Sequence, residues 1–224
     1  MFCLLVGVLA AGWLAWRDIS ARRELGPFPA ATIDKQPIHF AIRTFDPAAP
    51  PADMPRLAFG EEAVCDSNFL SNANVSGQPR KTDATHATVT ITQIKMTLGL
   101  TITIWAPAGA TQHVMEHEDG HREISEYYYR TADKIAERIA ARYIGTQVEI
   151  TGTDLAAESS KVTLQTANAI TDQYNKELSP EPAQQLYDSL TDHSRNDVNA
   201  KEATAAAIRN AGIPSTQPTS NPGN

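Results

Sequence analysis

The segment TQHVMEHEDGHREISEYYYRTADKIAERIAARY, residues 111–143, has the periodicity of a long amphipathic helix. Apolar and aromatic side chains, together with His117 and His121, recur at steps of three and four residues, whereas charged side chains occupy the other faces. We therefore predict one helix over 111–143 with both histidines on its inward stripe. Gly145 is a natural residue to end it, because glycine readily adopts the left-handed conformation that follows many helices.

The clearest strand pattern lies just upstream, in THATVTITQIKMTLGLTITIW, residues 85–105. Valine and isoleucine alternate with threonine on both sides of Gly99, which predicts a hairpin with one buried face and a turn at this glycine. Farther upstream, residues 38–45 alternate enough to form a strand. The proline-rich segment 46–56 is typical of a linker or surface loop, and the segment 65–83, rich in Asn, Ser and Gly, is also expected to be loop.

Three further helices are expected downstream, at about 154–177, 182–190 and 200–210. Together these patterns predict the α+β class, with a small antiparallel sheet packed on a long helix and followed by a helical C-terminal region. We expect residues 31–200 to form a single domain, large enough to be an enzyme. A helical stub and a disordered polar tail are expected to follow over 201–224.

Composition excludes some functions. The net charge is −7, and basic residues form no stripe that could neutralise phosphates, so we expect no nucleic-acid partner. One of the two cysteines, Cys3, lies in an apolar N-terminal run and the other, Cys65, stands alone, so a thiolate zinc site is excluded.

The N-terminal run FCLLVGVLAAGWLAW, residues 2–16, carries no charge. Its length fits the apolar part of a signal peptide and falls short of the roughly 20 residues of a comfortable membrane span. We therefore interpret residues 1–30 as a signal peptide or membrane anchor and expect a periplasmic or secreted domain, with possible membrane association through this segment.

The motif with the clearest chemistry is His117-Glu118-Asp119-Gly120-His121, which fits the pattern HExxH. Histidines at positions i and i+4 of a helix stand one above the other, so both imidazoles can bind one Zn²⁺ from the same face. The glutamate beside the first histidine can accept a proton from a zinc-bound water. The sequence thus predicts His117 and His121 as zinc ligands and Glu118 as the catalytic base.

A catalytic zinc needs a third protein ligand. The metzincin extension of the motif requires glycine and histidine where this chain has Ile124 and Tyr127, so that pattern is excluded. His193, in the segment YDSLTDH at the end of a predicted helix, is our choice, because a short turn there could return it to the first helix. The alternatives are the other histidines, His39, His86 and His113, and the acidic residues Glu149 and Glu158.

The pairing of HEDGHREI (117–124) with YDSLTDH (187–193) resembles a small bacterial family of secreted zinc-dependent proteases catalogued as DUF922. That family's helix motif typically reads HEQGHFDI, and its downstream motif typically ends in His-Gly, where this chain has Ser194. The resemblance covers roughly residues 114–195. It implies that His117, His121 and His193 are ligands, and that Asp188 orients an imidazole.

These observations lead us to expect a zinc-dependent peptidase that acts on a protein or peptide substrate and has a minimal zincin-like fold. An extended peptide could pair with a sheet edge at residues 101–105, just before the motif helix. The alternatives are a hydrolase that cleaves another bond and a non-catalytic envelope protein in which zinc is structural.

Overall fold

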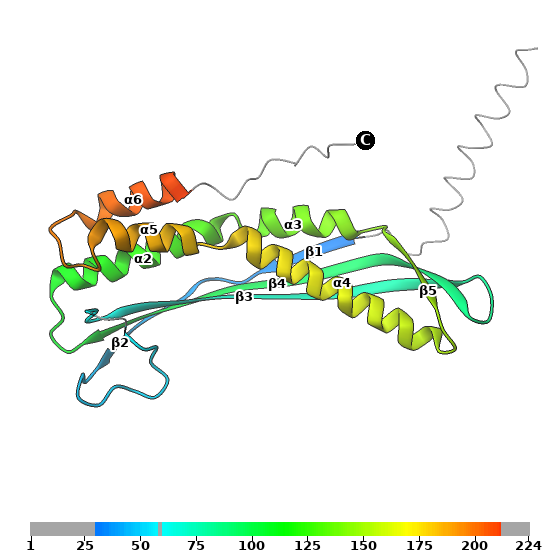
Figure 1. The fold of residues 1–224 in the computed structure, drawn as a ribbon, viewed down its shortest axis with the longest axis horizontal. Helices are drawn as coiled ribbons and strands as arrows, with labels where there is room; N and C mark the ends of the chain where they lie inside the picture. The colour runs from blue at the N-terminus through cyan, green and yellow to red at the C-terminus, as the bar shows by residue number, and fades with distance from the viewer. Residues whose placement is uncertain (1–29, 58–59, 212–224) are drawn as a thin grey trace, which may run out of the picture.

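The computed structural model describes residues 30–57 and 60–211. They form one mixed sheet and a layer of helices (Figure 1). The elements in chain order are β1 (Ala30–Lys35), β2 (His39–Phe45), β3 (Val64–Lys81), β4 (His86–Pro107), α2 (Gln112–Arg130), α3 (Ala132–Tyr143), β5 (Gln147–Thr151), α4 (Leu155–Leu178), α5 (Glu181–Thr191) and α6 (Ala200–Ala211).

Strand β4 is the axis of the sheet. On one side it pairs antiparallel with β3 along nearly its whole length. On its other side it pairs in succession with β5, β1 and β2. The α+β class agrees with the prediction, but the antiparallel sheet was only partly right, because β1 and β2 run parallel to β4. A short connection of three residues, 36–38, lets the chain continue in one direction from β1 into β2.

The long hairpin consists of β3 and β4, so the predicted turn at Gly99 was wrong. Gly99 lies inside β4, opposite Leu70. The predicted loop at 65–83 was also wrong, since most of it is β3. Pairing with β4 outweighs the low strand propensity of Asn, Ser and Gly, because propensity in a sheet depends mainly on the neighbouring strand and on burial.

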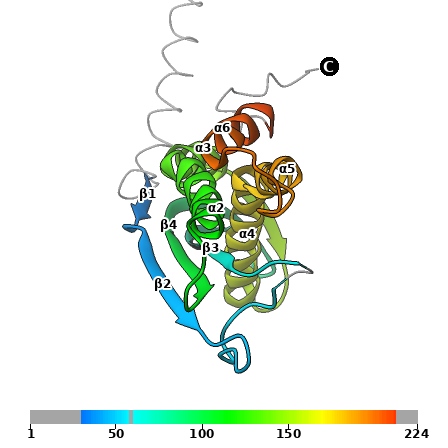
Figure 2. The same ribbon diagram turned by 90° about the vertical axis from the view of Figure 1, so that its left-hand side faces the viewer.

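The sheet has one covered and one open face. Even-numbered side chains of β4, from Ile94 to Ile104, are buried beneath the helices, whereas Lys95 and Thr97 point away from them. Each fully buried Ile or Leu contributes roughly 1.5–3 kcal/mol to folding. Helices α2 and α3 lie nearly end to end above the sheet, α4 runs beside β3, and α6 lies on the outer side of α2 and α5 (Figures 1 and 2).

The helix predicted over 111–143 is two helices, α2 and α3, separated at Thr131. The backbone N–H of Thr131 and its side-chain hydroxyl both donate to the carbonyl of Tyr128, at 3.2 and 3.1 Å. A threonine hydroxyl that bonds to the preceding turn competes with regular helical bonding. The apolar periodicity of the sequence continues through Thr131, so the sequence pattern gave no sign of the break between α2 and α3.

The predicted strand at 38–45 and the predicted helices near 154–177, 182–190 and 200–210 are confirmed as β2, α4, α5 and α6. Helix α6 shares the main core through Ala203 and Ala207, so it packs with the rest of the fold. In the part of the chain that the structure describes, none of the helices has the length and apolar character needed to cross a membrane. The predicted targeting segment and polar tail lie outside the described residues, apart from their boundaries at residue 30 and at 201–211.

Candidate metal centre

Helix α2 carries the motif residues. It begins after Thr111, whose side-chain oxygen accepts a hydrogen bond from the Val114 N–H, so the first turn is capped. His117 and His121, one helical turn apart, both face the interior between α2 and α5, and their side chains are 5% and 13% exposed. The prediction of two inward histidines on one helical face is confirmed.

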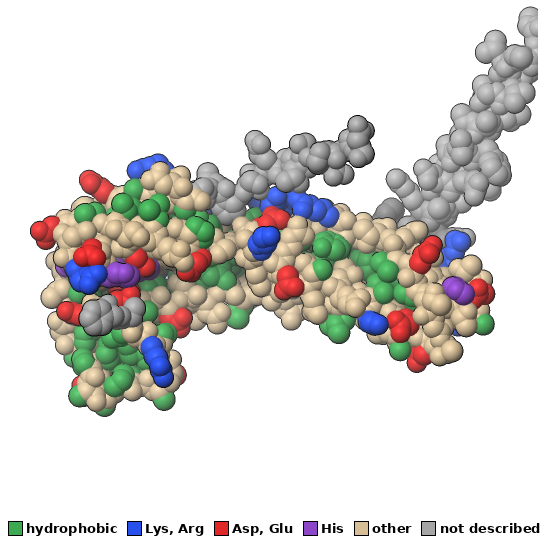
Figure 3. All heavy atoms as spheres, in the orientation of Figure 1, with side chains coloured by type: hydrophobic (Ala, Val, Ile, Leu, Met, Phe, Trp, Pro, Cys, Tyr) green, Lys and Arg blue, Asp and Glu red, His purple; other side chains and the backbone are tan. Residues whose placement is uncertain are grey.

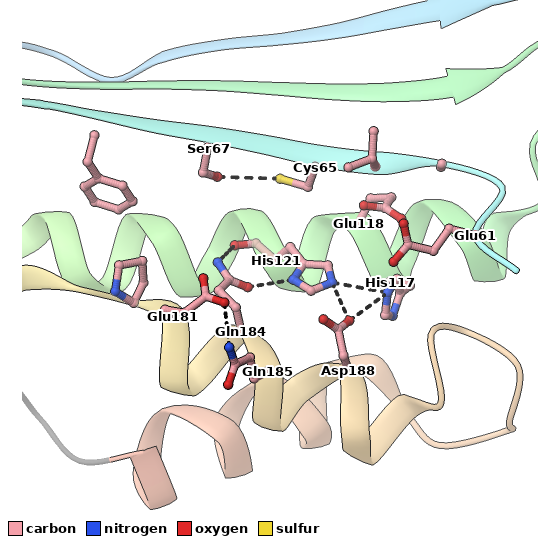
Figure 4. A pocket seen from close by; sticks show the side chains of 14 residues that line it. Glu61, Cys65, Ser67, His117, Glu118, His121, Glu181, Gln184, Gln185 and Asp188 are labelled. Carbon is pink, nitrogen blue, oxygen red and sulfur yellow. Dashed lines mark hydrogen bonds and ion pairs between the residues drawn. The ribbon is translucent and has the colours of Figure 1, made fainter. Parts of the chain in front are cut away.

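Helix α5 brings Asp188 against the two histidines. The His121 Nε2 atom lies 2.9 Å from Asp188 Oδ1 and 3.2 Å from His117 Nε2, and His117 Nε2 lies 3.6 Å from the same carboxylate oxygen. These three residues form a group that could hold a metal ion. Figure 4 shows the three side chains converging from α2 and α5.

The spacing within this group fits a tetrahedral ion. Ligand atoms about 2.0–2.2 Å from zinc lie about 3.3–3.6 Å from one another in a tetrahedral arrangement. The separations of 2.9, 3.2 and 3.6 Å are close to that range. Two nitrogen atoms and a carboxylate oxygen are a donor set that zinc accepts.

Gln184 fixes the orientation of the His121 ring. Its amide nitrogen donates to the His121 carbonyl at 3.1 Å and to Ser125 Oγ at 3.0 Å, so its amide oxygen faces His121 Nδ1 at 2.6 Å. The Nδ1 atom of the neutral ring must then carry the proton. The lone pair of Nε2 consequently points toward Asp188 and His117, which is the arrangement that a metal ligand needs.

Tyr187 holds both histidines from the side. Its hydroxyl donates to the His117 carbonyl at 3.1 Å. Its ring stacks on that of His117, with centroids 5.0 Å apart, and meets the edge of His121 at 4.8 Å. Gly120 makes this contact possible, because a Cβ atom at position 120 would lie 2.2 Å from the Tyr187 hydroxyl oxygen.

The protonation states of the group follow from burial and charge. Burial lowers the pKa of His117 to about 4, so this ring is neutral at pH 7. Burial acts in the same direction on His121, but Asp188 and Gln184 outweigh it and raise the pKa of His121 above its usual value. Burial opposes ionisation of Asp188, yet the adjacent His121 lowers the pKa of that carboxyl. A cation between Nε2 and the carboxylate therefore suits this group, whether it is a proton or a metal ion.

Glu118 lies in a pocket of about 280 Å³ beside the histidines, between α2, α5 and the start of β3. It is buried, and burial raises the pKa of its carboxyl to about 7. The backbone N–H of Cys65 donates to it, which acts in the opposite direction. Figure 3 shows histidine and acidic side chains in the hollow between the helical layer and the sheet. A carboxyl with a pKa near 7 can both accept and return a proton at neutral pH.

Cys65 also lines this pocket. Burial raises the pKa of its thiol to about 12, so the sulfur is protonated at neutral pH and is a poor nucleophile.

The structure places His193 at the rim of the group. Its Nδ1 atom lies 3.7 Å from Asp188 Oδ1 and 3.2 Å from Glu61 Oε1. Three consecutive residues, Asp192, His193 and Ser194, have φ angles of 47°, 53° and 62°, a left-handed turn that is costly for residues with a Cβ. This turn holds His193 facing the carboxylate, while Asp188 itself takes the place next to both motif histidines.

The other candidates for a third ligand do not join the group. His86 contacts Asp83 at 2.9 Å, at the end of β4 where β5 pairs, and Glu149 lies on β5. His113 is exposed at the start of α2.

Sequence reasoning missed the supporting residues Gln184 and Tyr187. The signal that could have found them is their spacing with Asp188, since positions 184, 187 and 188 share one face of a helix.

Comparisons with known proteins gave no match to any family model, to any curated protein or to any solved structure.

Proposed function

We propose that this protein is a zinc-dependent peptidase whose metal ligands are His117, His121 and Asp188. The observation that carries the proposal is the ligand-like spacing of these three groups beside a buried Glu118 in an accessible pocket. Asp188 takes the role first expected of His193, because it lies nearer to both histidines.

When bound, a zinc ion would supply the positive charge that acidifies a water molecule and polarises a substrate carbonyl. Glu118 accepts the proton of the attacking water as the water oxygen adds to the carbonyl carbon. It then delivers that proton to the amide nitrogen as the C–N bond breaks, which gives a carboxylic acid and an amine. At neutral pH the acid passes its remaining proton to the amine, so the products leave as a carboxylate and an ammonium ion. The pKa of about 7 fits both steps, because the group is then poised between its two forms at neutral pH.

His121 and Asp188 are held for their roles by neighbouring side chains. Gln184 keeps the Nε2 atom of His121 free to bind a cation, and Tyr187 fixes the backbone and ring of His117. Preorganisation of this kind typically accounts for a 10- to 100-fold effect on metal affinity.

A second candidate function is a structural zinc site without catalysis. His193 favours it, because its Nδ1 atom lies 3.7 Å from Asp188 Oδ1 and a small movement of the left-handed turn could add it as a fourth ligand. A site with four protein ligands is closed to substrate, whereas three ligands leave a position for water.

The experiment is hydrolysis of an unfolded protein by the zinc-loaded full chain, compared with Glu118→Gln. The two side chains have nearly the same shape, so zinc binding should persist while hydrolysis falls at least 100-fold. Equal hydrolysis by both proteins would exclude Glu118 as the base. Stoichiometric zinc with no hydrolysis of any substrate would favour the structural site.

The apolar run at residues 2–16 supports an extracytoplasmic location for this activity, and attachment to a membrane if this segment is retained. Fractionation of cells that express the full chain tests this part of the proposal.

A further inference from the structure

The first part of β3 forms one wall of the metal pocket. Strand β3 pairs with β4 on one side, and no strand of residues 30–57 or 60–211 pairs with its other side. The sheet edge at residues 101–105, expected to bind substrate, is in fact interior, because β2 and β3 pair with it on both sides. The backbone N–H of Cys65 already donates to Glu118, so the open edge beside the metal group belongs to residues 66–69. An unpaired edge can accept an extended peptide.

A smaller hollow of about 190 Å³ adjoins the metal pocket along this edge. Its lining is mainly apolar and includes Phe69, Leu178 and Pro180. Phe69 and Pro180 line both hollows, so the two adjoin. Beyond it, Ser71 donates to Asn175 of α4 at 2.7 Å, where the helix lies against β3. The small hollow is thus the last accessible part of the groove, and its volume suits one side chain rather than a drug-sized ligand.

We propose that this hollow, lined by Phe69, Leu178 and Pro180, binds one apolar side chain of an extended peptide that pairs with β3. This proposal rests on the proposed function, because it assumes that the peptide is cleaved beside the metal group and Glu118. Antiparallel pairing is the more stable arrangement per residue, so the peptide runs opposite to β3. Its N-terminal part then lies against Phe69. Its cleaved bond lies next to Cys65, whose backbone N–H donates to the Glu118 carboxyl and so holds this base beside the bond.

The position of the apolar residue follows from strand geometry. Phe69 is four residues beyond Cys65, which corresponds to about 13 Å along a strand. A paired strand has nearly the same rise per residue. The peptide residue in the small hollow is therefore three or four positions to the N-terminal side of the cleaved bond.

Two measurements on the full chain test this inference. The first uses the zinc-loaded protein and a peptide library, with cleavage sites mapped by mass spectrometry. We expect Leu, Met or Phe to be enriched three or four residues before the cleaved bond. The variant Phe69→Ala should lose this preference about tenfold, whereas the control Leu164→Ala, at an exposed site on α4, should keep it.

The second measurement does not need hydrolysis. A fluorescent serine-rich decapeptide with one leucine is titrated with Glu118→Gln, beside the same peptide without leucine, and binding is followed by anisotropy. The leucine peptide should bind about tenfold more tightly, and Phe69→Ala should abolish the difference. Equal binding of both peptides, or enrichment only after the cleaved bond, would overturn the subsite. Absence of zinc with a retained leucine preference would instead overturn the proposed function alone.

Discussion

Gly120→Ala tests whether the contact between α2 and α5 builds the site. The added Cβ atom would lie 2.2 Å from the hydroxyl oxygen of Tyr187, 2.4 Å from its Cζ atom and 2.8 Å from Thr204 Oγ1. Alanine favours a helix over glycine by up to about 1 kcal/mol, whereas forcing extra volume into a packed site costs about 1–3 kcal/mol. Because Tyr187 is fully buried, it cannot move without moving α5.

The difference between these two terms predicts that Gly120→Ala lowers the free energy of unfolding by up to about 2 kcal/mol, and the melting temperature by about 2–4 °C per kcal/mol. Zinc affinity should fall as well, since Asp188 moves with Tyr187 on α5. The matched control is Gly99→Ala, where the nearest atom to the added Cβ, Leu70 Cβ, is at an ordinary 3.5 Å. Thermal unfolding and zinc titration measure both effects. A Gly120→Ala protein with the parent's stability and zinc affinity would refute the reasoning.

Three further predictions concern the groups around the ligands. Gln184→Leu should weaken zinc binding by about 10–100-fold, because His121 loses the partner that fixes its Nδ1 proton, and Gln185→Leu, which disturbs a bond to Glu181, serves as the control in a zinc titration. Zinc affinity should rise with pH by up to about tenfold per pH unit while His121 is protonated, because zinc must then displace the proton that its raised pKa retains. Competition with a chelating dye at a series of pH values measures this. Glu118→Gln should raise the free energy of unfolding of the metal-free protein at pH 8 by up to about 3 kcal/mol, as measured by denaturant titration.

The sign of the last effect follows from the raised pKa. Folding raises the pKa of Glu118 from 4.5 to about 7, so the folded state favours the protonated carboxyl. The associated stability is fully present below about pH 4.5 and is lost as pH rises through about 7. The gain from Glu118→Gln should therefore vanish near pH 4.5. An equal gain in unfolding free energy for Glu118→Gln at pH 8 and pH 4.5 would contradict the burial argument.

An unchanged zinc affinity in Gln184→Leu would contradict the role of the Gln184 amide. Zinc binding that does not depend on pH would contradict the displacement of a proton from His121.

Local pattern was sufficient for part of the fold. The 3.6-residue period correctly placed the motif histidines on the buried face of α2, because that face is defined by its own residues. It failed at Thr131, where a side-chain hydroxyl ends the helix without changing the apolar stripe. It also failed for β3, whose polar composition resembles a loop. There, Cys65 and Phe69 are partly buried while Asp66 and Asn68 are exposed, an alternation that becomes meaningful only beside β4.

The site residues also fall into those that local sequence identifies and those that it does not. His117, Glu118 and His121 are close in sequence, so a motif could identify them. Asp188 reaches them from α5, and its place depends on Tyr187 fitting over Gly120, which is a tertiary contact. The assignment of His193 as the third ligand stays a prediction, since its ring lies beside Asp188 and Glu61 in a strained turn.

Zinc content of the purified full chain, compared with His117→Ala, Asp188→Ala and His193→Ala, tests the central claim most directly. We predict close to one zinc ion per chain in the parent and in His193→Ala, and little or none in the other two variants. Loss of zinc from His193→Ala with retention in Asp188→Ala would assign the third ligand to His193. A parent protein that takes up no zinc after supplementation would contradict the metal centre itself.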